Sequence, residues 1–333
     1  AGKKVGMIGT TGTMIGDVVT PTLNTTPESY ELHQAFSQMV EAGCEYAVME
    51  VSSQGIKMHR TDGLILTMVF FTNISPDHIG PGEHADFEEY LYYKTRLLNM
   101  CRIGLVNKDD EHAEQIIKAA DCELYTYSEK GKEADFSASD IRYVSQPDFV
   151  GTEFHISGKY DMEVRLGIPG LFNVVNALAA VSVCSFLDLD KEKISHALEH
   201  IRVNGRMEIV YTSERCTVLV DYAHNAVSME SLLSTLRDYK PKRLVCVFGC
   251  GGNRSKDRRY SMGEIGGKLA DLSIITADNS RYEKVEDIIA DIRGSIEKTG
   301  GSFIEIPDRR EAIRYSILQA QPGDMVAVIG KGH

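Results

Sequence analysis

The sequence contains no apolar run approaching the roughly 18 residues that a membrane-spanning helix needs, and its first residues do not form a signal peptide. It also lacks a regular cysteine framework, because its seven cysteines are odd in number and irregularly spaced. Cys246 and Cys250 stand too far from other ligands to make a zinc site. A basic excess is missing too, and the net charge of -12 argues against general nucleic-acid binding. These absences predict a cytoplasmic protein with reduced thiols, no membrane span and no nucleic-acid partner.

The composition is that of a globular protein, and the chain is long enough for two domains. Hydrophobic residues make up 43% and charged residues 25% of the chain, as in soluble globular proteins. Its 333 residues exceed the size at which a single core stops growing. The chain starts at Ala1 and stops at "VIGKGH", directly after an expected strand and glycine turn. We therefore expect a segment of a longer protein.

Short apolar runs alternate with helical patterns, which predicts an α/β protein with a largely parallel sheet. The strands expected first are Lys4–Ile8, Tyr46–Val51, Thr67–Thr72 and Ile103–Val106. A hairpin is expected in "TEFHISGKYDMEVRLGI", followed by a buried helix in "IPGLFNVVNALAAVSVCSFLDL". A boundary near Val203–Gly205 then gives domains at residues 1–204 and 205–333.

The second domain repeats the α/β pattern on a smaller scale. Four strands are expected at "TVLVDY", "RLVCVF", "LSIITA" and "DMVAVI", with helices such as Ser228–Asp238 and Val285–Lys298 between them. This predicts a doubly wound, Rossmann-like domain, in which ligands bind beyond the carboxyl ends of the strands. Four polar, glycine-bearing loops follow those ends: "DYAHN", "GCGGNRSKDRR", "ADNSRYE" and "GKGH".

Two of these loops carry side chains suited to small anionic or zwitterionic ligands. The glycines of "GCGGN" lack the Rossmann spacing, but a basic cluster follows them in an acidic protein. That cluster, Arg254, Lys256, Arg258 and Arg259, indicates either an anion site or a solvated helix start. Asp278 and Arg281 could grip the ammonium and carboxylate of an amino acid. An internal salt bridge between the two is the alternative.

Lys94 lies in an unusual place on a predicted helix. Asp86 and Glu89 form a capping-box pattern before that helix. Its apolar face consists of Phe87, Tyr90, Leu91, Leu97 and Leu98, with Lys94 in the middle. The lysine either snorkels to the edge of the face or is held inward for function with its charge neutralised or altered.

Polar side chains also follow two strands of the first domain. Glu50 ends one expected strand, and Asn73, Asp77 and His78 follow the next. Oxygen ligands with one imidazole favour magnesium over zinc. A solvated strand end and a structural histidine are the alternatives. We expect the two strands to be neighbours, so the pattern indicates a magnesium or phosphate site.

These motifs together resemble the Mur ligases, most closely the MurE type. The likeness runs in order through essentially the whole chain. It rests on "NTTPE", "MEVSSQGIKMHR", "FTNISPDH", "EEYLYYKTRLL", "GIPGLFNVVNALAA", "NGRMEIV", "VDYAHNAVSMESLL", "VFGCGGNRSKDRR", "ADNSRYE" and "AVIGKGH".

The resemblance implies an ATP-dependent amide-bond ligase with a central domain over residues 1–204 and a C-terminal ligase domain over 205–333. Such a ligase adds a third amino acid to UDP-N-acetylmuramoyl-L-alanyl-D-glutamate through an acyl phosphate, in peptidoglycan precursor synthesis. ATP and Mg²⁺ are the implied cofactors, and a UDP-muramoyl dipeptide and a diamino acid are the implied partners. We expect a monomer. Closure of the second domain would hinge at Val203–Arg206.

The resemblance also implies roles for individual residues. The expected catalytic residues and metal ligands are Glu50, His78 and Lys94, the lysine as a carbamate. The expected contacts to ATP are Asn73, Asn176, Arg206, Asp221, Tyr222 and His224. The expected contacts to the UDP-sugar dipeptide are Thr25, Thr26, Ser52 and Arg60. The expected pocket for the incoming amino acid is Arg254, Asp278, Asn279, Arg281 and Gly330.

Several positions depart from the family pattern. Ser280 replaces the proline of the usual Asp-Asn-Pro-Arg, but Arg281 is kept, so meso-diaminopimelate is favoured over lysine. Met58 and Asn253 replace a common glutamine and aspartate. The stretch "DHIGPGEHADFEEY" is longer than usual, which leaves the partner of His84 open.

The first residues, "GKKVGMIGTTGT", do not contain the family's Gly-Lys-Thr phosphate loop, which lies upstream of the position that matches Ala1. Residues Gly9–Gly16 are expected to form a turn leading towards Thr25 and Thr26. We expect the isolated segment to be inactive. The alternatives are a related carboxylate–amine ligase of folylpolyglutamate or cyanophycin type, which "NTTPE" and "DNSR" disfavour, and a non-catalytic pseudo-ligase.

Overall fold

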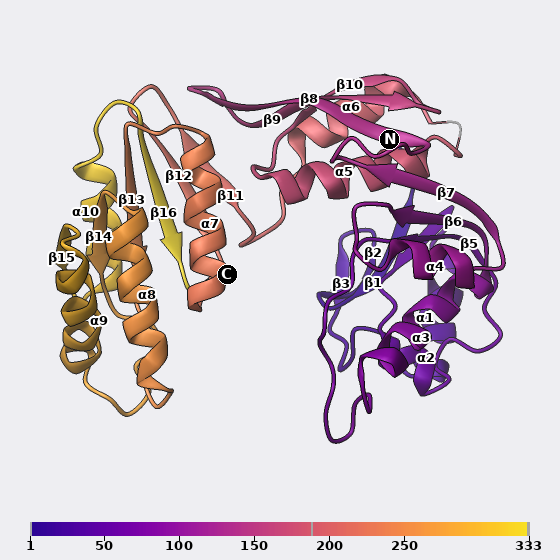
Figure 1. The fold of residues 1–333 in the computed structure, drawn as a ribbon, viewed down its shortest axis with the longest axis horizontal. Helices are drawn as coiled ribbons and strands as arrows, with labels where there is room; N and C mark the ends of the chain where they lie inside the picture. The colour runs from indigo at the N-terminus through magenta and orange to yellow at the C-terminus, as the bar shows by residue number, and fades with distance from the viewer. Residues whose placement is uncertain (1, 188, 332–333) are drawn as a thin grey trace. The chain divides into compact units, whose positions relative to one another are not determined.

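The computed structural model describes residues 2–187 and 189–331, which form two compact units (Figure 1). The first unit comprises Ala1–Ser139, Ile156–Met162 and Val175–Ile194, and the second comprises Asp140–His155, Glu163–Val174 and Ser195–His333. The units therefore interleave along the chain instead of meeting at one boundary. The division into domains 1–204 and 205–333 stays a prediction.

The first unit begins with a four-stranded sheet in the order β3-β2-β1-β4. Its strands are β1 (Val5–Gly9), β2 (Gly12–Ile15), β3 (Val18–Thr20) and β4 (Tyr46–Met49). Strands β1 and β4 pair in parallel, whereas β1, β2 and β3 form an antiparallel meander. The prediction of one turn over Gly9–Gly16 was therefore wrong, because Gly12–Ile15 folds back as a strand. Helix α1 (Ser29–Glu41) buries Leu32, Ala35 and Met39 against Ile8.

A second, six-stranded sheet has the order β10-β9-β8-β7-β6-β5. Its strands are β5 (Leu66–Phe71), β6 (Cys101–Asn107), β7 (Glu123–Ser128), β8 (Phe136–Gln146), β9 (Phe149–Gly158) and β10 (Met162–Leu166). Strands β5 to β8 are parallel, and the expected hairpin is formed by the adjacent β9 and β10. Around this sheet lie α2 (Ser53–Lys57), α3 (Phe87–Arg96), η1 (Leu97–Met100) and α4 (Ala113–Ala119).

Two helices follow β10. Helix α5 (Leu171–Cys184) is the expected buried helix, and α6 (Lys191–His200) comes after it. Val174, Leu178 and Val181 of α5 are almost fully buried. Their four- and three-residue spacing places them on one face of the helix, which explains why this apolar segment folds as a helix.

The second unit contains a six-stranded sheet in the order β11-β12-β16-β13-β14-β15. Its strands are β11 (Glu208–Thr212), β12 (Cys216–Asp221), β13 (Arg243–Phe248), β14 (Leu272–Ile275), β15 (Phe303–Glu305) and β16 (Asp324–Ile329). The four predicted strands are present and parallel. The prediction missed the antiparallel β11 and the short β15, which form the two edges.

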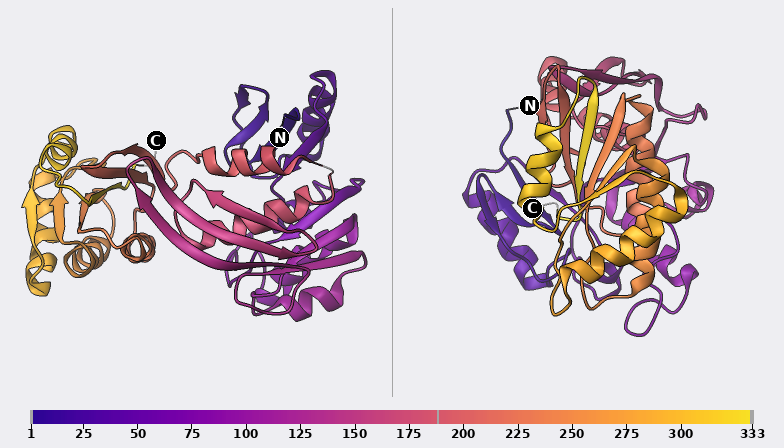
Figure 2. Two further views of the ribbon diagram at one scale, coloured as in Figure 1. Left: turned by 90° about the horizontal axis from the view of Figure 1, so that it is seen from above. Right: turned by 90° about the vertical axis from the view of Figure 1, so that its left-hand side faces the viewer.

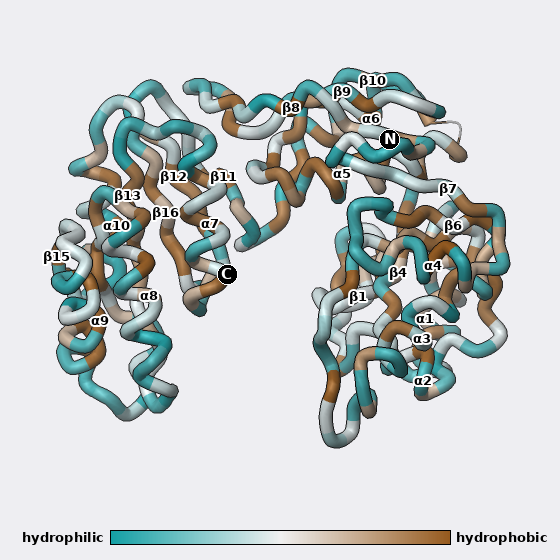
Figure 3. The backbone as a smooth tube through the Cα atoms, viewed as in Figure 1, coloured by the Kyte–Doolittle hydropathy of each residue, from teal (hydrophilic) through white to brown (hydrophobic). Residues whose placement is uncertain are grey.

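Helices cover both faces of this sheet. They are α7 (Ala226–Asp238), α8 (Lys256–Leu269), α9 (Val285–Thr299) and α10 (Arg309–Leu318). Leu244, Cys246 and Phe248 of β13 pack in one core with α7, α8 and α9, and Val245 and Val247 pack with α10 in the other. The right view of Figure 2 shows the yellow α10 on the opposite side of the sheet from the orange helices. The buried strands between them are the apolar segments coloured brown in Figure 3, as the doubly wound prediction requires.

Among the described residues, no helix combines the length and the apolar composition that crossing a membrane would need.

Candidate functional site

The predicted site residues are distributed over both units, and each unit holds its own group. In the first unit, Glu50 follows β4 and Thr10 follows β1. The Thr10 backbone N–H and hydroxyl both donate to Glu50 Oε2, at 2.9 and 2.8 Å. Thr10 Oγ1 also lies 3.1 Å from Thr25 Oγ1. Parallel pairing of β1 and β4 brings these two carboxyl ends together. A Cβ atom on Gly9 would come within 2.9 Å of Glu50 Cδ, so a larger residue there would displace the Glu50 carboxylate.

Glu50 is thereby connected to the predicted dipeptide contacts. The Thr26 hydroxyl accepts from Ser52 N at 2.9 Å and donates to the Glu50 carbonyl at 3.1 Å. Arg60 Nη1 donates to the Thr26 carbonyl at 3.2 Å. Arg60 Nη2 lies 2.7 Å from Glu28 Oε1, and the Arg60 side chain is only 14% exposed. Four predicted residues and one predicted metal ligand thus form a single network.

Sequence reasoning did not single out Thr10 or Glu28. Thr10 belongs to the stretch "GKKVGMIGTTGT", which does not contain the family's phosphate loop. Glu28 belongs to the motif "NTTPE". The proximity of Thr10 to Glu50 could have been predicted from the parallel strands that precede them, because residues that follow two such strands meet at one edge of the sheet.

His78 and Lys94 are brought together by a third side chain, Tyr90. The His78 ring lies 5.8 Å from the Tyr90 ring, and Lys94 Nζ lies 5.9 Å from the centre of the same ring. His78 itself has a φ of 54°, and its Nδ1 is 3.4 Å from Glu83 Oε1. The buried Tyr90, on the same apolar helix face, therefore connects the two predicted catalytic residues.

The Lys94 ammonium is held in surroundings that disfavour its charge. Lys94 is half-buried, and burial lowers its pKa below the ordinary lysine value. Within residues 2–187 and 189–331, no carboxylate lies at ion-pair distance from it. These observations fit the lysine held inward better than the snorkelling lysine, which would keep its ammonium in water.

The side chains of Glu50, His78 and Lys94 offer only part of the ligand set that a magnesium ion needs. Glu50 offers Oε1, which accepts no hydrogen bond from the described residues, and His78 is exposed. Across those residues, no group of three or more His, Cys, Asp and Glu side chains converges. Glu50 and His78 alone would be a sparse set, and an oxygen-bearing modification of Lys94 would supply the missing hard ligand.

The loop that carries His78 is fixed to α2 through His84. His84 is fully buried, and its Nε2 lies 2.9 Å from Ser53 Oγ. Burial and the neighbouring Lys57 lower the pKa of the His84 imidazole. Lys57 Nζ also donates to the Glu83 carbonyl and pairs with Glu89 Oε1, both at 2.9 Å. The partner of His84, which the sequence left open, is therefore Ser53.

The expected capping box before α3 is only partly formed. Glu89 N donates to Asp86 Oδ1 at 2.8 Å, as predicted. The returning bond to the Glu89 carboxylate comes from Ala85 N, one residue earlier than the usual pattern.

Asn73 and Asn176 are exposed, and within the described part of the chain no hydrogen bond to either side chain is formed. Strands β4 and β5, which precede Glu50 and Asn73, are edge strands of different sheets. The expectation that they are neighbouring strands was wrong, because sequence order does not decide which strands pair.

In the second unit, the loop after β12 gathers four predicted ATP contacts. The buried Asp221 accepts from Ala223 N at 2.7 Å and from Met207 N at 2.8 Å. The Arg206 guanidinium lies 5.8 Å from the centre of the Tyr222 ring. The His224 and Tyr222 rings meet edge to face with centres 5.0 Å apart. Asp221 thus fixes the backbone on which the other three side chains are carried.

Asp278 and Gly330 lie in the loops that follow β14 and β16. Gly330 has a φ of 104°, and a Cβ atom there would stand 3.2 Å from Asp278 Oδ2. Asp278 Oδ1 is 4.0 Å from Lys331 Nζ. The last two residues of the predicted "GKGH" loop, Gly332 and His333, lie outside the described residues.

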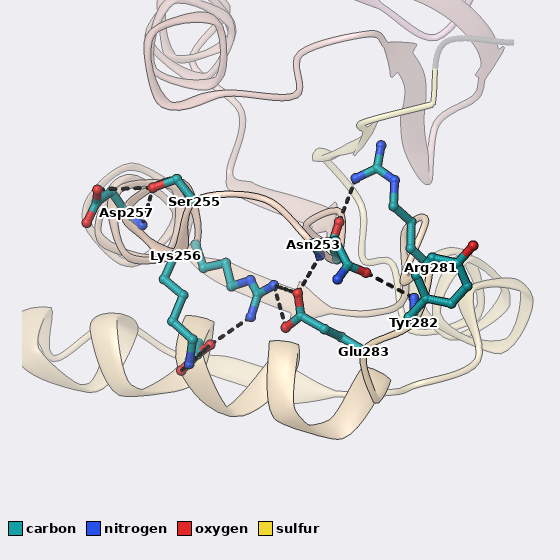
Figure 4. A network of polar contacts seen from close by, with 10 residues as sticks. Asn253, Ser255, Lys256, Asp257, Arg281, Tyr282 and Glu283 are labelled. Carbon is teal, nitrogen blue, oxygen red and sulfur yellow. Dashed lines mark hydrogen bonds and ion pairs between the residues drawn. The ribbon is translucent and has the colours of Figure 1, made fainter.

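The loops after β13 and β14 are joined by hydrogen bonds (Figure 4). Gly252 N donates to the Asn279 carbonyl at 2.8 Å, and Arg281 Nη1 donates to the Gly252 carbonyl at 2.5 Å. Asp278 and Arg281 do not pair with each other. The alternative of an internal salt bridge between them is thereby removed, and both side chains keep capacity for a ligand.

Only part of the basic cluster after β13 is available to an anion. Arg254 is exposed and Arg258 is half-buried. Arg259 is 1% exposed and pairs with Glu283 and Asp291, and Lys256 pairs with Asp291 at 3.1 Å. The anion-site alternative is therefore disfavoured for Arg259 and Lys256, because carboxylates of the same unit pair with them, and the solvated-helix-start alternative does not describe the buried Arg259.

Comparisons with known proteins match both parts of the chain. A family model described as "Mur ligase middle domain" matches residues 1–184, and one described as "Mur ligase, glutamate ligase domain" matches residues 205–332. A Caldanaerobacter subterraneus subsp. tengcongensis protein named UDP-N-acetylmuramoyl-L-alanyl-D-glutamate--2,6-diaminopimelate ligase is 40% identical over 337 residues. The match covers 99% of this chain and 68% of that protein. A Clostridium acetobutylicum protein of the same name, numbered 1, is 39% identical over 100% of this chain and 68% of its own length.

The chain also matches solved structures of such ligases. A structure of a UDP-N-acetylmuramoyl-L-alanyl-D-glutamate--2,6-diaminopimelate ligase superposes with a TM-score of 0.81 and 32% identity, over 99% of this chain and 68% of that one. A folylpolyglutamate synthase from Thermotoga maritima matches with a TM-score of 0.68 and 17% identity, over 99% of this chain and 80% of that one. This second likeness is one of fold alone.

Proposed function

Because the chain belongs to the Mur ligase family, whose members are ATP-dependent ligases, we propose that it joins diaminopimelate to UDP-N-acetylmuramoyl-L-alanyl-D-glutamate. The names of its relatives give this substrate pair. The observation that carries the proposal is the network of Thr10, Thr25, Thr26, Glu50 and Ser52. It connects an expected metal ligand with the expected contacts to the dipeptide.

The proposed reaction proceeds through an acyl phosphate. The terminal carboxylate of the dipeptide attacks the γ-phosphorus of ATP, and ADP leaves. The amine of diaminopimelate then attacks the acyl carbon, and the tetrahedral intermediate loses its amine proton and expels phosphate. The protein contributes alignment of three substrates and stabilisation of phosphoryl charge.

In the first unit, Thr25, Thr26, Ser52 and Arg60 would bind the dipeptide. Glu50, His78 and Lys94, the lysine as a carbamate, would hold Mg²⁺, which when bound supplies positive charge opposite the phosphoryl oxygens. The lowered pKa of Lys94 supports this role, because a neutral amine is the form that carbon dioxide can modify.

The nucleotide and the amino acid have separate sets of expected contacts. Asn73, Asn176, Arg206, Asp221, Tyr222 and His224 would contact ATP. Arg254, Asp278, Asn279, Arg281 and Gly330 would bind diaminopimelate. Asp278 suits its ammonium group and Arg281 its distal carboxylate, since a guanidinium forks onto a carboxylate.

A substrate panel tests the proposal. Phosphate release by the complete gene product is followed with UDP-N-acetylmuramoyl-L-alanyl-D-glutamate or a folate as the carboxylate, and with diaminopimelate, lysine or glutamate as the amine. We expect turnover only with the muramoyl dipeptide, and fastest with diaminopimelate. Turnover of the folate with glutamate, or binding of the dipeptide without any phosphate release, would contradict the proposal.

A further inference from the structure

The second unit contains a buried arginine with no assigned role in ligand binding. Arg259 of α8 is 1% exposed, and its Nη2 bonds both carboxylate oxygens of Glu283 at 2.8 Å. Its Nη1 bonds Asp291 of α9 at 2.9 Å. One guanidinium therefore neutralises two carboxylates, but these carboxylates differ in what else they contact.

Glu283 reaches beyond the arginine to the loop after β13 (Figure 4). Its Oε1 accepts the backbone N–H of Asn253. The Asn253 side chain in turn accepts the backbone N–H of Tyr282 at 3.1 Å. Glu283 is thus fixed by a buried cation on one side and fixes the tip of a neighbouring loop on the other.

The residues joined in this way have left-handed backbone conformations. Asn253 has a φ of 51° and Arg281 a φ of 49°, values that are uncommon for side-chain-bearing residues, although asparagine adopts them more readily than arginine. The Arg281 guanidinium is also oriented by its bond to the carbonyl of Gly252, next to Asn253. The placement of Arg281 consequently depends on the placement of the loop that Glu283 holds.

We infer that Glu283 is a positioning residue for the amino-acid pocket, and that it sets selectivity for a diamino acid with a distal carboxylate by orienting Arg281. This rests on the proposed function, in which Arg281 binds that carboxylate. Glu283 is conformationally fixed through Arg259 and does not itself contact the substrate.

Charge is essential to this role. The Arg259 bond and the Asn253 N–H hold the pKa of Glu283 below its ordinary value, so the carboxylate stays ionised. A glutamine at 283 can keep its carbonyl oxygen at the Oε1 position, which accepts from both Arg259 and Asn253 N, but its NH₂ group then replaces Oε2 and faces the guanidinium, which is also a donor. Glu283→Gln therefore removes one Arg259 bond and the negative charge, and so weakens the connection between the arginine and the loop with little change in volume.

Asp291 provides a matched control within the same cluster. It shares Arg259 with Glu283 but bonds Lys256 on its other side and makes no bond to the Asn253 loop. Asp291→Asn removes a comparable ion pair and leaves the loop contacts intact. A merely structural role of the cluster would make the two variants behave alike.

The first experiment compares steady-state kinetics of the wild type, Glu283→Gln and Asp291→Asn in the complete gene product. In Glu283→Gln we expect KM for diaminopimelate to rise about tenfold or more, and its kcat/KM advantage over lysine to fall about as much. KM for ATP and for the UDP-dipeptide should stay within about twofold, as should all parameters of Asp291→Asn. Equal effects in the two variants, or an unchanged preference in Glu283→Gln, would overturn the inference.

The second experiment is independent of turnover. Amide hydrogen exchange of the same proteins is measured without substrate. We expect exchange at Asn253 and Tyr282 to accelerate about tenfold or more in Glu283→Gln and to be unchanged in Asp291→Asn. If the wild type fails to use diaminopimelate, the proposed function fails, and this measurement still decides whether Glu283 holds the loop. Unchanged exchange in Glu283→Gln would refute that hold.

Discussion

At the scale of single residues, Lys94 is the most informative position in the first unit. Its half-buried ammonium has no carboxylate partner among the described residues, and burial lowers its pKa. If the residue works as a carbamate, Lys94→Ala should lower kcat about a hundredfold or more, because charge at the phosphoryl group is then uncompensated. Added acetate or formate should restore part of the rate, measured as phosphate release.

The exposed Lys118 of α4 is the matched control, because Lys118→Ala removes an ammonium without touching the site. Wild-type activity of Lys94→Ala without added acid would remove the lysine from the mechanism. Loss of activity with no response to short acids would argue for a purely structural role.

Arg60 makes a second prediction at this scale. Its guanidinium is occupied by the exposed carboxylate of Glu28 at 2.7 Å, where the proposal places a substrate contact. If Glu28 competes with the dipeptide for Arg60, Glu28→Gln should lower KM for the UDP-dipeptide about threefold and leave KM for ATP unchanged. A higher KM for the dipeptide in Glu28→Gln would show instead that Glu28 orients Arg60.

At the scale of elements, the connection between α2 and the His78 loop predicts a pH dependence of stability. The folded-state pKa of the buried His84 is below its ordinary value, so the unfolded state binds a proton first as pH falls. The free energy of unfolding should therefore fall as pH drops from about 7.5 to about 5.5, through the unfolded pKa. In His84→Gln that acid-dependent loss should be smaller, as measured by urea unfolding at both pH values. An equal loss in the variant would exclude His84 as its source.

The turn at the end of β16 gives a second prediction for an element. Gly330→Ala combines a φ of 104° with a contact of 3.2 Å to Asp278 Oδ2, so it should destabilise the protein by about 1–3 kcal/mol and raise KM for diaminopimelate. Gly300, the C-cap of α9, has a φ of 74° with open space around it. Gly300→Ala should cost stability alone. An unchanged KM in Gly330→Ala would remove Gly330 from the pocket.

At the scale of the whole molecule, the sequence predicts best where one physical signal dominates. Strands such as β13 and β16 are continuous apolar runs buried on both faces, and their positions were predicted to within a residue or two. Edge strands carry a weaker signal: β15 is only three residues long, and β11 exposes Val210 and Tyr211. Both were missed for that reason.

Some candidate site residues could be predicted from the sequence, and others could not. Residues that follow strands, such as Glu50 and Asp278, could be found from the rule on strand ends. The burial of Arg259 could not be predicted, because the sequence of a helix start does not show whether a basic residue there faces water or two carboxylates. The partners of Glu50 and Arg281 likewise depend on loops that meet only in the folded chain.

The central claim is the ligation of diaminopimelate to the UDP-linked dipeptide. Its most direct measurement is the mass of the nucleotide product formed by the complete gene product with ATP, UDP-N-acetylmuramoyl-L-alanyl-D-glutamate and an equimolar mixture of diaminopimelate and lysine. We predict a product heavier by one diaminopimelate residue, formed with one phosphate released per bond, and little of the lysine adduct. A product that carries lysine, or no adduct while ATP is consumed, would contradict it.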